Sequence, residues 1–441
     1  MPEHDNKRSP TQPQEGGRDV LGFSLLPFDF CVLTFDLLFL FFVEDLVDEY
    51  GGSPGTRILM VAGGTGGHIF PALAVAEVMR ARGESSGSRY VIEFLGTHRP
   101  LEAKLIPAAG FRLRTVDAAG LKGIGGIQRL RNLLVLPRTA VAVAGILREF
   151  RPQVVVGVGG YLAGPVMLEA ALVGIPTVLI EPNARPGFTN RLLAPIVSAA
   201  AVGFAETGHL YGKKAQVTGH PVRRAFFDIP PRRHGPLSPA PPGVAVAPPL
   251  PTVSPPRFTV LVVGGSQGSR AINHAVSEGL WLLGQEPGGI RIVHQTGEHD
   301  YNEARKAYQE HGLVAEVHAF IDDMPGALAQ ADLVISRAGA MAVAELAAAG
   351  RAALLIPFPS AADQHQLENA RVLEKAGAAR VIVQADLAPV LRGAERLAAE
   401  IRELMASPAT LELMEIRARR LARPDAADRI ADIVEGLVRK S

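Results

Sequence analysis

Two glycine-rich loops, one in each half of the 441-residue chain, have the composition of a phosphate-binding turn. The first is GGTGGH at residues 63–68, and the second is GGSQGS at residues 264–269. Each loop follows an apolar strand-like run and precedes a helix-like stretch. Glycine allows the main chain to turn tightly and approach a ligand, and the free N–H groups of the following helix attract an anion. Two such loops predict a nucleotide site in the cleft between the halves.

His68 and Ser266 are the side chains of these loops with the clearest chemistry. The dipole at the start of a helix lowers the pKa of an imidazole, so a neutral His68 would suit a general base. The alternative is a histidine that merely caps the loop. Ser266 would donate its hydroxyl to a phosphate oxygen. A dinucleotide fingerprint would also have an acid at the end of the second strand. FLGT at residues 94–97 has none, which argues against a nicotinamide-dependent oxidoreductase.

Polar groups also follow other predicted strands, at the sheet edge where α/β proteins bind ligands. Such segments are GVGGY at residues 157–161, EPNARPG at 181–187 and DQHQLEN at 363–369. Glu345 lies in the second turn of a predicted helix, where both its oxygens would reach a diol such as a ribose; otherwise it is a solvated glutamate. Arg223, in GHPVR, would pair with a pyrophosphate unless it is an ordinary surface arginine.

Strands that alternate with helices position these motifs, and this pattern predicts parallel sheets covered on both faces. Strands are expected at residues 58–62, 91–95, 154–158, 177–180, 199–202 and 216–218, and again at 258–263, 291–295, 317–320, 333–336, 353–357 and 381–383. Helices are expected at 69–82, 105–110, 139–150, 165–173, 269–283, 302–311, 324–331, 340–349, 365–376, 407–422 and 426–440. The fold class is therefore α/β, with two doubly wound Rossmann-like domains facing each other across a cleft.

The domain boundaries follow from composition. Residues 229–257 are rich in proline and are expected to form a linker or surface insertion. They would separate an N-terminal domain, 56–228, from a C-terminal domain, 258–424. Residues 425–441 are expected to form a helix that packs back on the N-terminal domain.

The first 55 residues are expected to be a disordered extension, translated from a start codon upstream of the true one. Residues 20–43 within it are rich in Phe and Leu, but Asp29 and Asp36 make a membrane-inserted anchor costly. No cleavage site of a signal peptide is evident. The only cysteine is Cys31, so an internal disulfide and a structural zinc site of cysteines are excluded. The net charge of +1 predicts no nucleic-acid partner.

The motifs occur together in the order of one enzyme family. The likeness is carried by GGTGGHIFPALA, GVGGYLAGP, EPNARPGFTN, TGHPVR, GGSQGSRAIN, HQTG, FIDDM, SRAGAMAVAE and DQHQLENA. Residues 56–440 resemble the bacterial UDP-N-acetylglucosamine–N-acetylmuramyl-(pentapeptide) pyrophosphoryl-undecaprenol N-acetylglucosamine transferases. The resemblance implies a two-Rossmann, or GT-B, fold with a C-terminal UDP-sugar domain and an N-terminal acceptor domain. It also implies inverting transfer of N-acetylglucosamine from UDP-GlcNAc to lipid I, giving lipid II in peptidoglycan synthesis.

The same resemblance implies a set of site residues. His68 would be the base that activates the acceptor hydroxyl. Arg223 and Ser266 would hold the diphosphate, and Ile321 would bind the uracil through its main chain. Glu345 would bind the ribose, and Gln366 the sugar hydroxyls. The other donor contacts would come from Thr65, Gly66, Gly67, Asn183, Ala340, Met341, Ala342, Val343 and Ala344.

The chain departs from the family pattern at four places. The family usually has HEQN where this chain has IEPN at residues 180–183, and GNPVR where it has His220 in GHPVR. A threonine is common in place of Ala342, and a glutamine in place of His365. None of these changes removes a proposed essential group, but the affinity for the donor could differ.

No cofactor and no protein-bound metal are expected, because loop N–H groups, Ser266 and Arg223 suit the charge that grows on the diphosphate. Asp322 and Asp323 are adjacent and not spaced to place both carboxylates on one face. The implied partners are UDP-N-acetylglucosamine, lipid I (the undecaprenyl-pyrophosphate-linked muramyl pentapeptide) and an anionic membrane surface.

The enzyme would act peripherally on the cytoplasmic face of the membrane. An apolar face with a basic rim at residues 121–134 would contact the lipid, unless it is an ordinary packed helix.

Other functions stay open on sequence grounds. One is another lipid-directed UDP-sugar glycosyltransferase of the same fold, although GGTGGH and GVGGY favour the peptidoglycan enzyme. A UDP-sugar epimerase would need a carboxylate-rich site in the first half, where Glu181 is the one candidate. A catalytically inert membrane-docking protein would leave an intact nucleotide site unused.

Overall fold

The structure, a computed structural model, describes residues 55–117, 126–232, 258–283, 290–313, 315–359 and 364–438, without the side chains of 126–136. Its contacts divide the chain into two units, Met1–Pro54 and Gly55–Ser441, and every described residue belongs to the second. The expectations for the N-terminal extension and for most of the proline-rich segment, residues 233–257, therefore fall outside the described residues.

The first half is a sheet of seven strands that pair in parallel throughout, in the order β3-β2-β1-β4-β5-β6-β7. Its strands are β1 (Thr56–Val61), β2 (Tyr90–Gly96), β3 (Arg112–Thr115), β4 (Val154–Gly157), β5 (Thr177–Glu181), β6 (Ala199–Val202) and β7 (Ala215–Val217). Its helices are α2 (Gly66–Ser86), α3 (Pro100–Ala108), α4 (Gly126–Phe150), α5 (Gly160–Leu172) and α6 (Phe188–Leu193), with 3₁₀ turns at Ala205–Leu210 and Gly212–Lys214.

The second half is a parallel sheet of six strands in the order β10-β9-β8-β11-β12-β13. Its strands are β8 (Phe258–Val263), β9 (Ile290–Gln295), β10 (Ala315–His318), β11 (Leu333–Ser336), β12 (Ala353–Leu355) and β13 (Ala379–Val381). Its helices are α8 (Arg270–Leu283), α9 (Tyr301–Glu310), α10 (Met324–Gln330), α11 (Ala340–Ala349), α12 (His365–Lys375) and α13 (Val390–Met405), with a 3₁₀ turn at Gln384–Leu387. The short α7 (Arg224–Phe227) precedes it, and α14 (Pro408–Leu421) and α15 (Ala426–Val438) end the chain.

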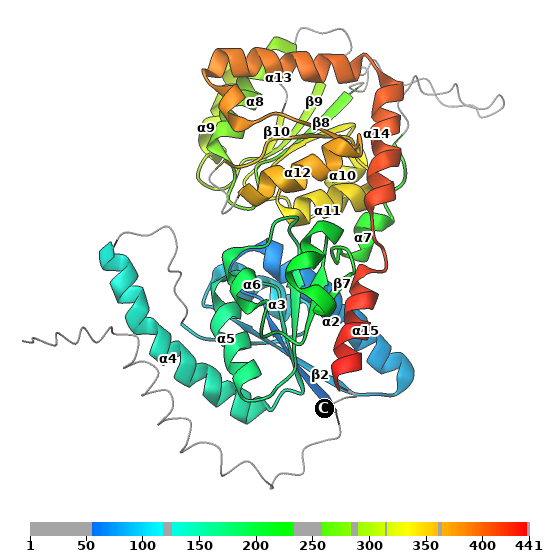
Figure 1. Cartoon of the computed structure of the whole chain (residues 1–441). Helices are drawn as coiled ribbons and strands as arrows, with labels where there is room; N and C mark the ends of the chain where they lie inside the picture. The colour runs from blue at the N-terminus through cyan, green and yellow to red at the C-terminus, as the bar shows by residue number, and fades with distance from the viewer. Residues whose placement is uncertain are drawn as a thin grey trace, which may run out of the picture. The chain divides into compact units, whose positions relative to one another are not determined.

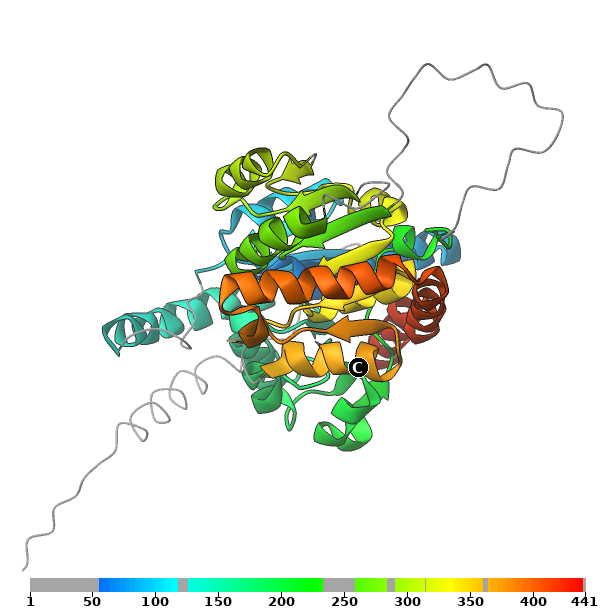
Figure 2. The same cartoon turned by 90° about the horizontal axis from the view of Figure 1, so that it is seen from above.

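Both faces of each sheet are buried, as a doubly wound fold requires. Along β1, Ile58 and Met60 join the core on the side of α2, α3 and α15, and Leu59 and Val61 join the core on the side of α4, α5 and α6. This alternation follows from the two-residue period of a strand. The second sheet is covered in the same way. Figure 2 shows α13, in orange, beside the green α8 that it contacts. The predicted α/β class with two doubly wound sheets is confirmed.

Several elements differ from the sequence expectation. The helix α13 and the strand β3 were not predicted. The helices α3 and α4 begin before the residues expected, at Pro100 and Gly126, and each contains an internal proline. None of the helices in the described part of the chain combines the length and apolarity needed to cross a bilayer.

The C-terminal helices serve both cores. Helix α14 packs against α11 and α13 of the second half, and α15 packs against α2 of the first half (Figure 1). Ile430, Ala431 and Val434 of α15 are fully buried in the core that contains β1 and α2. Arg82 of α2 fastens the exposed side of α15, with Asp432 at 2.7 Å and Asp428 at 2.9 Å. The last helix is thus part of the first-half core.

We expect Ile430→Ala to lower the free energy of unfolding by about 2–5 kcal/mol, because it removes a buried side chain and leaves a cavity. Chemical denaturation followed by circular dichroism measures this. The matched control is Ile416→Ala on α14, where the side chain is 43% exposed and the change should stay within about 0.5 kcal/mol. If Ile430→Ala lowered the free energy of unfolding no more than Ile416→Ala does, this would contradict the place of α15 in the first-half core.

Candidate active site

The loop 63–68 places His68 in the first turn of α2, directly after β1. The Nδ1 atom of His68 lies 3.1 Å from the carbonyl oxygen of Gly63. A carbonyl only accepts, so Nδ1 carries the proton and a neutral ring presents its lone pair at Nε2. Burial is the main cause that lowers the pKa of His68 below its usual value, and nearby His365 lowers it further. The ring is therefore a neutral proton acceptor at neutral pH.

The buried carboxylate of Glu102, on α3, holds this loop in place. Its Oε1 accepts a hydrogen bond of 2.6 Å from the main-chain N–H of Gly64 and one of 2.8 Å from the hydroxyl of Thr97. Its other oxygen accepts from the main-chain N–H of Thr97. Charge-assisted bonds of this kind are stronger than neutral ones. Sequence reasoning missed Glu102, since its partners lie on two other segments.

A second loop packs directly on the first. Gly160 has φ +85, and a Cβ atom there would lie 3.2 Å from the carbonyl oxygen of Gly63 and 3.5 Å from the ring of His68. Only glycine fits both the left-handed backbone and this close approach. The GVGGY segment therefore forms one wall of the His68 site. Because the nearest atom is the main-chain oxygen of Gly63, which cannot move as freely as a side chain, we expect position 160 to require glycine.

Glu181, at the end of β5, is fully buried and organises the segment after it. It accepts hydrogen bonds from the main-chain and side-chain nitrogens of Asn183, at 2.9 and 3.1 Å, and from the amide of Asn190 at 2.8 Å. Burial raises its pKa to about 7, although these donors oppose the shift. Both oxygens of the Glu181 carboxyl group therefore accept hydrogen bonds, one from Asn183 and the other from Asn190.

Asn183 and Asn369 join the two halves. The Nδ2 of Asn369, on α12, donates to Oδ1 of Asn183 at 3.3 Å and to the carbonyl of Ala338 at 3.2 Å. Its Oδ1 accepts from the main-chain N–H of Ala184 at 2.9 Å. Asn369 is fully buried, and it belongs to the polar segment at residues 363–369 that the sequence indicated as a binding loop. The predicted donor contact Asn183 thus also takes part in a contact between the halves.

The second glycine loop packs on the segment after β9. Gly268 has φ +76, and a Cβ there would collide with the main-chain oxygen of Thr296. Gln295, the last residue of β9, donates to the carbonyl of Gly265 at 2.9 Å and accepts from the N–H of Ile321 at 2.8 Å. The N–H of Ile321 is thus already engaged, which leaves its carbonyl as the main-chain group for a uracil. Ser266 is exposed at the tip of the loop.

Arg223 and Glu345 form the charged part of the site. The guanidinium of Arg223 lies 4.7 Å from the ring centroid of Phe70 on α2 and 5.2 Å from that of Phe226. Its Nε is buried and has no hydrogen-bond partner within the described residues. Glu345 is partly buried; burial raises its pKa to about 7, and the charge of Arg223 acts against that rise. Arg223 is therefore no ordinary surface arginine, and its Nε can serve an anion.

The remaining predicted donor residues fall on α2, α11 and α12. Thr65 is exposed at the N-cap of α2, and its hydroxyl makes no capping bond. Gln366 accepts from the N–H of Phe358 at 3.0 Å, which leaves its amide N–H₂ for another acceptor. Partly buried residues are Gly66, Gly67, Met341, Ala342 and Ala344, and buried ones are Ala340 and Val343. Helix α11, which carries Glu345, contacts α2.

His220 is the departure from the family pattern with the clearest structural consequence. It is buried, and neither ring nitrogen has a hydrogen-bond partner in the described part of the chain. Burial, with His68 nearby, lowers its pKa to about 3, so the ring is neutral. A polar group without a partner costs stability. No group of three His, Cys, Asp or Glu side chains that could hold a metal ion occurs among the described residues.

Two family models match the chain. The glycosyltransferase family 28 N-terminal domain matches residues 58–202, and the family 28 C-terminal domain matches residues 259–430. A protein of Anaeromyxobacter sp. (strain Fw109-5) is 44% identical over 385 residues, 87% of this chain and 94% of that one. A protein of Myxococcus xanthus (strain DK1622) is 42% identical over 383 residues, 87% and 93% of the two chains. Both are named UDP-N-acetylglucosamine–N-acetylmuramyl-(pentapeptide) pyrophosphoryl-undecaprenol N-acetylglucosamine transferase.

Solved structures agree. The crystal structure of Acinetobacter baumannii MurG aligns with a TM-score of 0.65 at 29% identity, covering 87% of this chain and all of that one. A putative UDP-N-acetylglucosamine 2-epimerase from Listeria monocytogenes aligns with a TM-score of 0.60 at 10% identity, covering 88% of this chain and 97% of that one. The latter likeness shows the fold alone.

We expect Glu102→Gln to loosen the loop 63–68, because an amide group replaces a carboxylate that accepts from Gly64 and Thr97. A lost bond to a charged group is worth about 1.5–3 kcal/mol. Hydrogen exchange of the amides in this loop should therefore accelerate about tenfold to a hundredfold, measured by mass spectrometry. Glu84→Gln, at an exposed position of α2, is the matched control and should leave the exchange unchanged. Unchanged exchange in Glu102→Gln would contradict the anchoring role.

Proposed function

Because the chain belongs to glycosyltransferase family 28, and within it to the N-acetylglucosamine transferases with which its sequence aligns, we propose that it makes lipid II. It would move N-acetylglucosamine from UDP-GlcNAc to the 4-hydroxyl of the N-acetylmuramyl-pentapeptide of lipid I, in peptidoglycan synthesis. Identity of 44% over 94% of a relative of that name is the observation that carries the proposal. Cell shape and cell division would depend on this reaction through the cell wall.

The donor would lie along the carboxyl ends of the second sheet. The N–H groups of the loop 264–268, the hydroxyl of Ser266 and the free Nε of Arg223 would receive the diphosphate. Glu345 would accept from the two ribose hydroxyls, and these donors would favour its ionised form. The carbonyl of Ile321 would accept from uracil N3–H.

The transferred sugar would lie between the halves. The amide of Gln366 would donate to sugar hydroxyls, and Asn183 would contact the sugar from the first half. The remaining contacts would come from Thr65, Gly66 and Gly67 and from the segment Ala340, Met341, Ala342, Val343 and Ala344.

His68 would act as the general base. Its Nε2 lone pair would take the proton of the acceptor 4-hydroxyl while that oxygen attacks C1 from the face opposite UDP. The C1–O bond to the diphosphate breaks as the β-1,4 bond forms, and the electron pair leaves with UDP. The negative charge that grows there would meet Arg223, Ser266 and the loop N–H groups, so no metal would be required. The contact of 3.1 Å between Nδ1 of His68 and the carbonyl oxygen of Gly63 supports the tautomer that this step would need.

The direct test is transfer of radiolabelled sugar from UDP-GlcNAc to a lipid I analogue. We expect His68→Ala to lower kcat/KM about a hundredfold to ten-thousandfold, the range for removal of a general base. Since the pKa of His68 in the free enzyme lies below 6.5, the acid limb of the wild-type kcat/KM profile should have its midpoint below pH 6.5 and should vanish in the variant.

His274→Ala is the matched control, on α8 with a half-exposed ring, and should keep the wild-type profile. Glu345→Ala should raise the KM for UDP-GlcNAc. Absence of transfer by the wild type would contradict the proposed function. Transfer to a different lipid acceptor in its place would support the alternative, another lipid-directed UDP-sugar glycosyltransferase. Wild-type activity in His68→Ala would leave the function and contradict the role of the histidine.

A lipid-linked acceptor implies peripheral attachment to the cytoplasmic face of the membrane. The segment 121–134 predicted to make this contact lies outside the described residues or, from 126 onward, has no described side chains. The neighbouring helices α5 and α6, which contact each other, supply an alternative surface. Tyr161, Leu168 and Leu172 share one face of α5, at spacings of seven and four residues. Phe188 and Leu192 share one face of α6, and all five are exposed.

This apolar surface of α5 and α6 has a basic group, Lys214, near its border. Lys214 donates to the carbonyl of Pro195 at 2.6 Å, next to the exposed Ile196. Cationic groups around an apolar surface suit an anionic membrane, since apolar burial and attraction to lipid headgroups then act together. We therefore assign the membrane contact to these two helices.

We expect Leu192→Asp to weaken attachment to vesicles that contain anionic phospholipid, because a carboxylate would replace a side chain that is 61% exposed within the apolar surface. Flotation of the full chain with such vesicles measures the bound fraction, which should fall severalfold. Leu413→Asp, on α14 with 50% exposure, is the matched control and should bind like the wild type. Equal binding of all three proteins would contradict this surface.

A further inference from the structure

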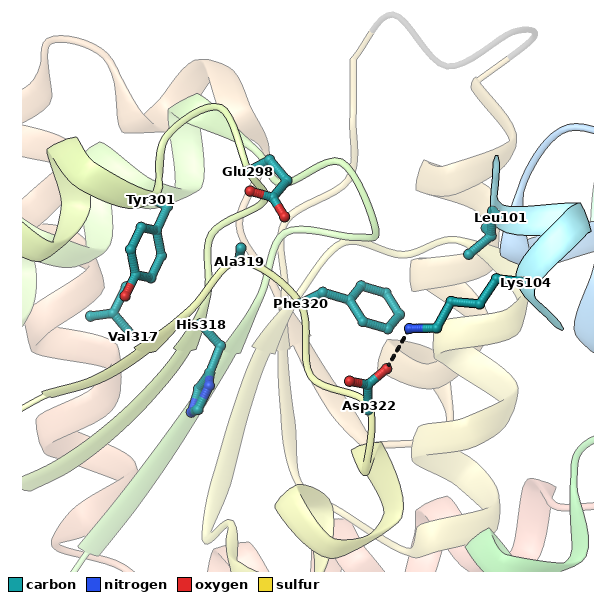
Figure 3. Close-up of a pocket in the computed structure, with 9 residues that line it drawn as sticks. All are labelled: Leu101, Lys104, Glu298, Tyr301, Val317, His318, Ala319, Phe320 and Asp322. Carbon is teal, nitrogen blue, oxygen red and sulfur yellow. Dashed lines mark hydrogen bonds and ion pairs between the residues drawn. The ribbon is translucent and has the colours of Figure 1, made fainter. Parts of the chain in front are cut away.

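A cavity of about 520 Å³ lies beside the proposed donor site (Figure 3). It is lined by Leu101 and Lys104 of α3 in the first half, and by Glu298, Tyr301, Val317, His318, Ala319, Phe320 and Asp322 of the second half. Those second-half residues follow or belong to β9, α9 and β10, at the sheet edge where ligands bind. None of the proposed roles of the site uses this cavity.

The cavity is distinct from the surface that would hold the donor. Phe320 and Asp322 line it, but Ile321 between them does not. The N–H of Ile321 is bonded to Gln295, which in turn donates to Gly265 in the donor loop. One segment, residues 320–322, therefore separates the two: its main chain is tied to the donor loop, and two of its side chains face the cavity.

The lining favours a cationic group. Two carboxylates, Glu298 and Asp322, face a single ammonium, Lys104, so the formal charge of these three groups is −1. Lys104 and Asp322 are 3.2 Å apart, but their side chains are 66% and 79% exposed. Such an exposed pair is worth about 0–1 kcal/mol and exchanges partners readily. The ring of Phe320 adds a face that attracts a cation; Lys104 already lies 6.0 Å from its centroid.

Helix α3 connects this cavity to the reacting end of the proposed acceptor. Glu102 on that helix bonds the N–H of Gly64 in the loop that carries His68. Lys104, two residues farther along the same helix, lines the cavity. A five-residue peptide attached to the sugar at His68 spans up to about 17 Å when extended, since each residue adds roughly 3.3–3.6 Å. That length exceeds the diameter of a helix with its side chains, about 10–12 Å.

We propose that this cavity binds the peptide of the acceptor, with Glu298 and Asp322 receiving an ammonium group of a peptide side chain. This inference rests on the proposed function, because the peptide is part of that acceptor. The site makes the enzyme selective for acceptors with an amine-bearing peptide. Lys104 competes for the same carboxylates and thereby limits that preference.

Transfer from UDP-GlcNAc to three acceptors tests the proposal: a lipid I analogue with lysine at the third peptide position, the same analogue with that amine acetylated, and one without peptide. For the wild type we expect a KM about two- to fivefold lower for the first acceptor than for the second. That factor is the worth of a partly exposed ion pair, up to about 1 kcal/mol. Glu298→Gln and Asp322→Asn should each remove part of this difference and leave kcat and the KM for UDP-GlcNAc unchanged.

Lys104→Met should act in the opposite direction and lower the KM for the amine-bearing acceptor, since it frees both carboxylates. Glu310→Gln, at an exposed position of α9, is the matched control and should keep the wild-type selectivity. Equal KM values for the three acceptors would overturn the peptide site and leave the proposed function intact, as would a rise in the KM for UDP-GlcNAc in Glu298→Gln. Failure of the wild type to transfer to any of the acceptors would overturn the proposed function, and the peptide site with it.

Discussion

Close packing of backbone on backbone at the carboxyl ends of the two sheets is the constraint on which this site depends. At Gly160 a Cβ atom would lie 3.2 Å from the carbonyl oxygen of Gly63, a tight contact, and at Gly268 a Cβ atom would collide with the main-chain oxygen of Thr296. Both glycines have positive φ, a backbone conformation that glycine adopts without strain and that other residues rarely adopt. Close main-chain contacts thus fix the loops of the site, and these loops carry side chains such as His68 and Ser266.

Burial then sets the chemistry of those side chains. It lowers the pKa of His68 and of His220, and it raises the pKa of Glu181 and of Glu345 to about 7. Each shift disfavours the charged form, as desolvation does. The Nε of Arg223 is buried and has no partner among the described residues. Glu345 is the carboxylate whose pKa the charge of Arg223 affects. A bound diphosphate would bring further negative charge to the guanidinium of Arg223.

The sequence was sufficient for the parts of the site that are local. Strand, glycine turn and helix follow one another within a few residues, so β1 with His68 and β8 with Ser266 could be predicted from pattern alone. The roles of Glu102 and Gln295 and the partners of Asn369 could not be predicted, because they depend on residues distant in sequence: Asn369 contacts Ala184 across 185 residues. Helix α13 was missed although its signal is local, since its buried residues Leu397, Ile401 and Leu404 repeat at helical spacing. The hydrogen bond from the N–H of Ile321 to the distant Gln295 could not be predicted either.

Contacts between the two halves connect the helix that carries Glu345 to the segments around Asn183 and His68. Asn369 bonds the carbonyl of Ala338, in the turn that leads into α11, and also bonds Asn183 of the first half. Glu345 sits on α11, which also contacts α2, the helix that begins beside His68. A ligand held by Glu345 therefore acts on a helix that touches the His68 helix directly and reaches Asn183 through one residue. Because Glu181 in turn accepts a hydrogen bond from Asn183, the turn before α11 and the segment after β5 are joined through Asn369 and Asn183.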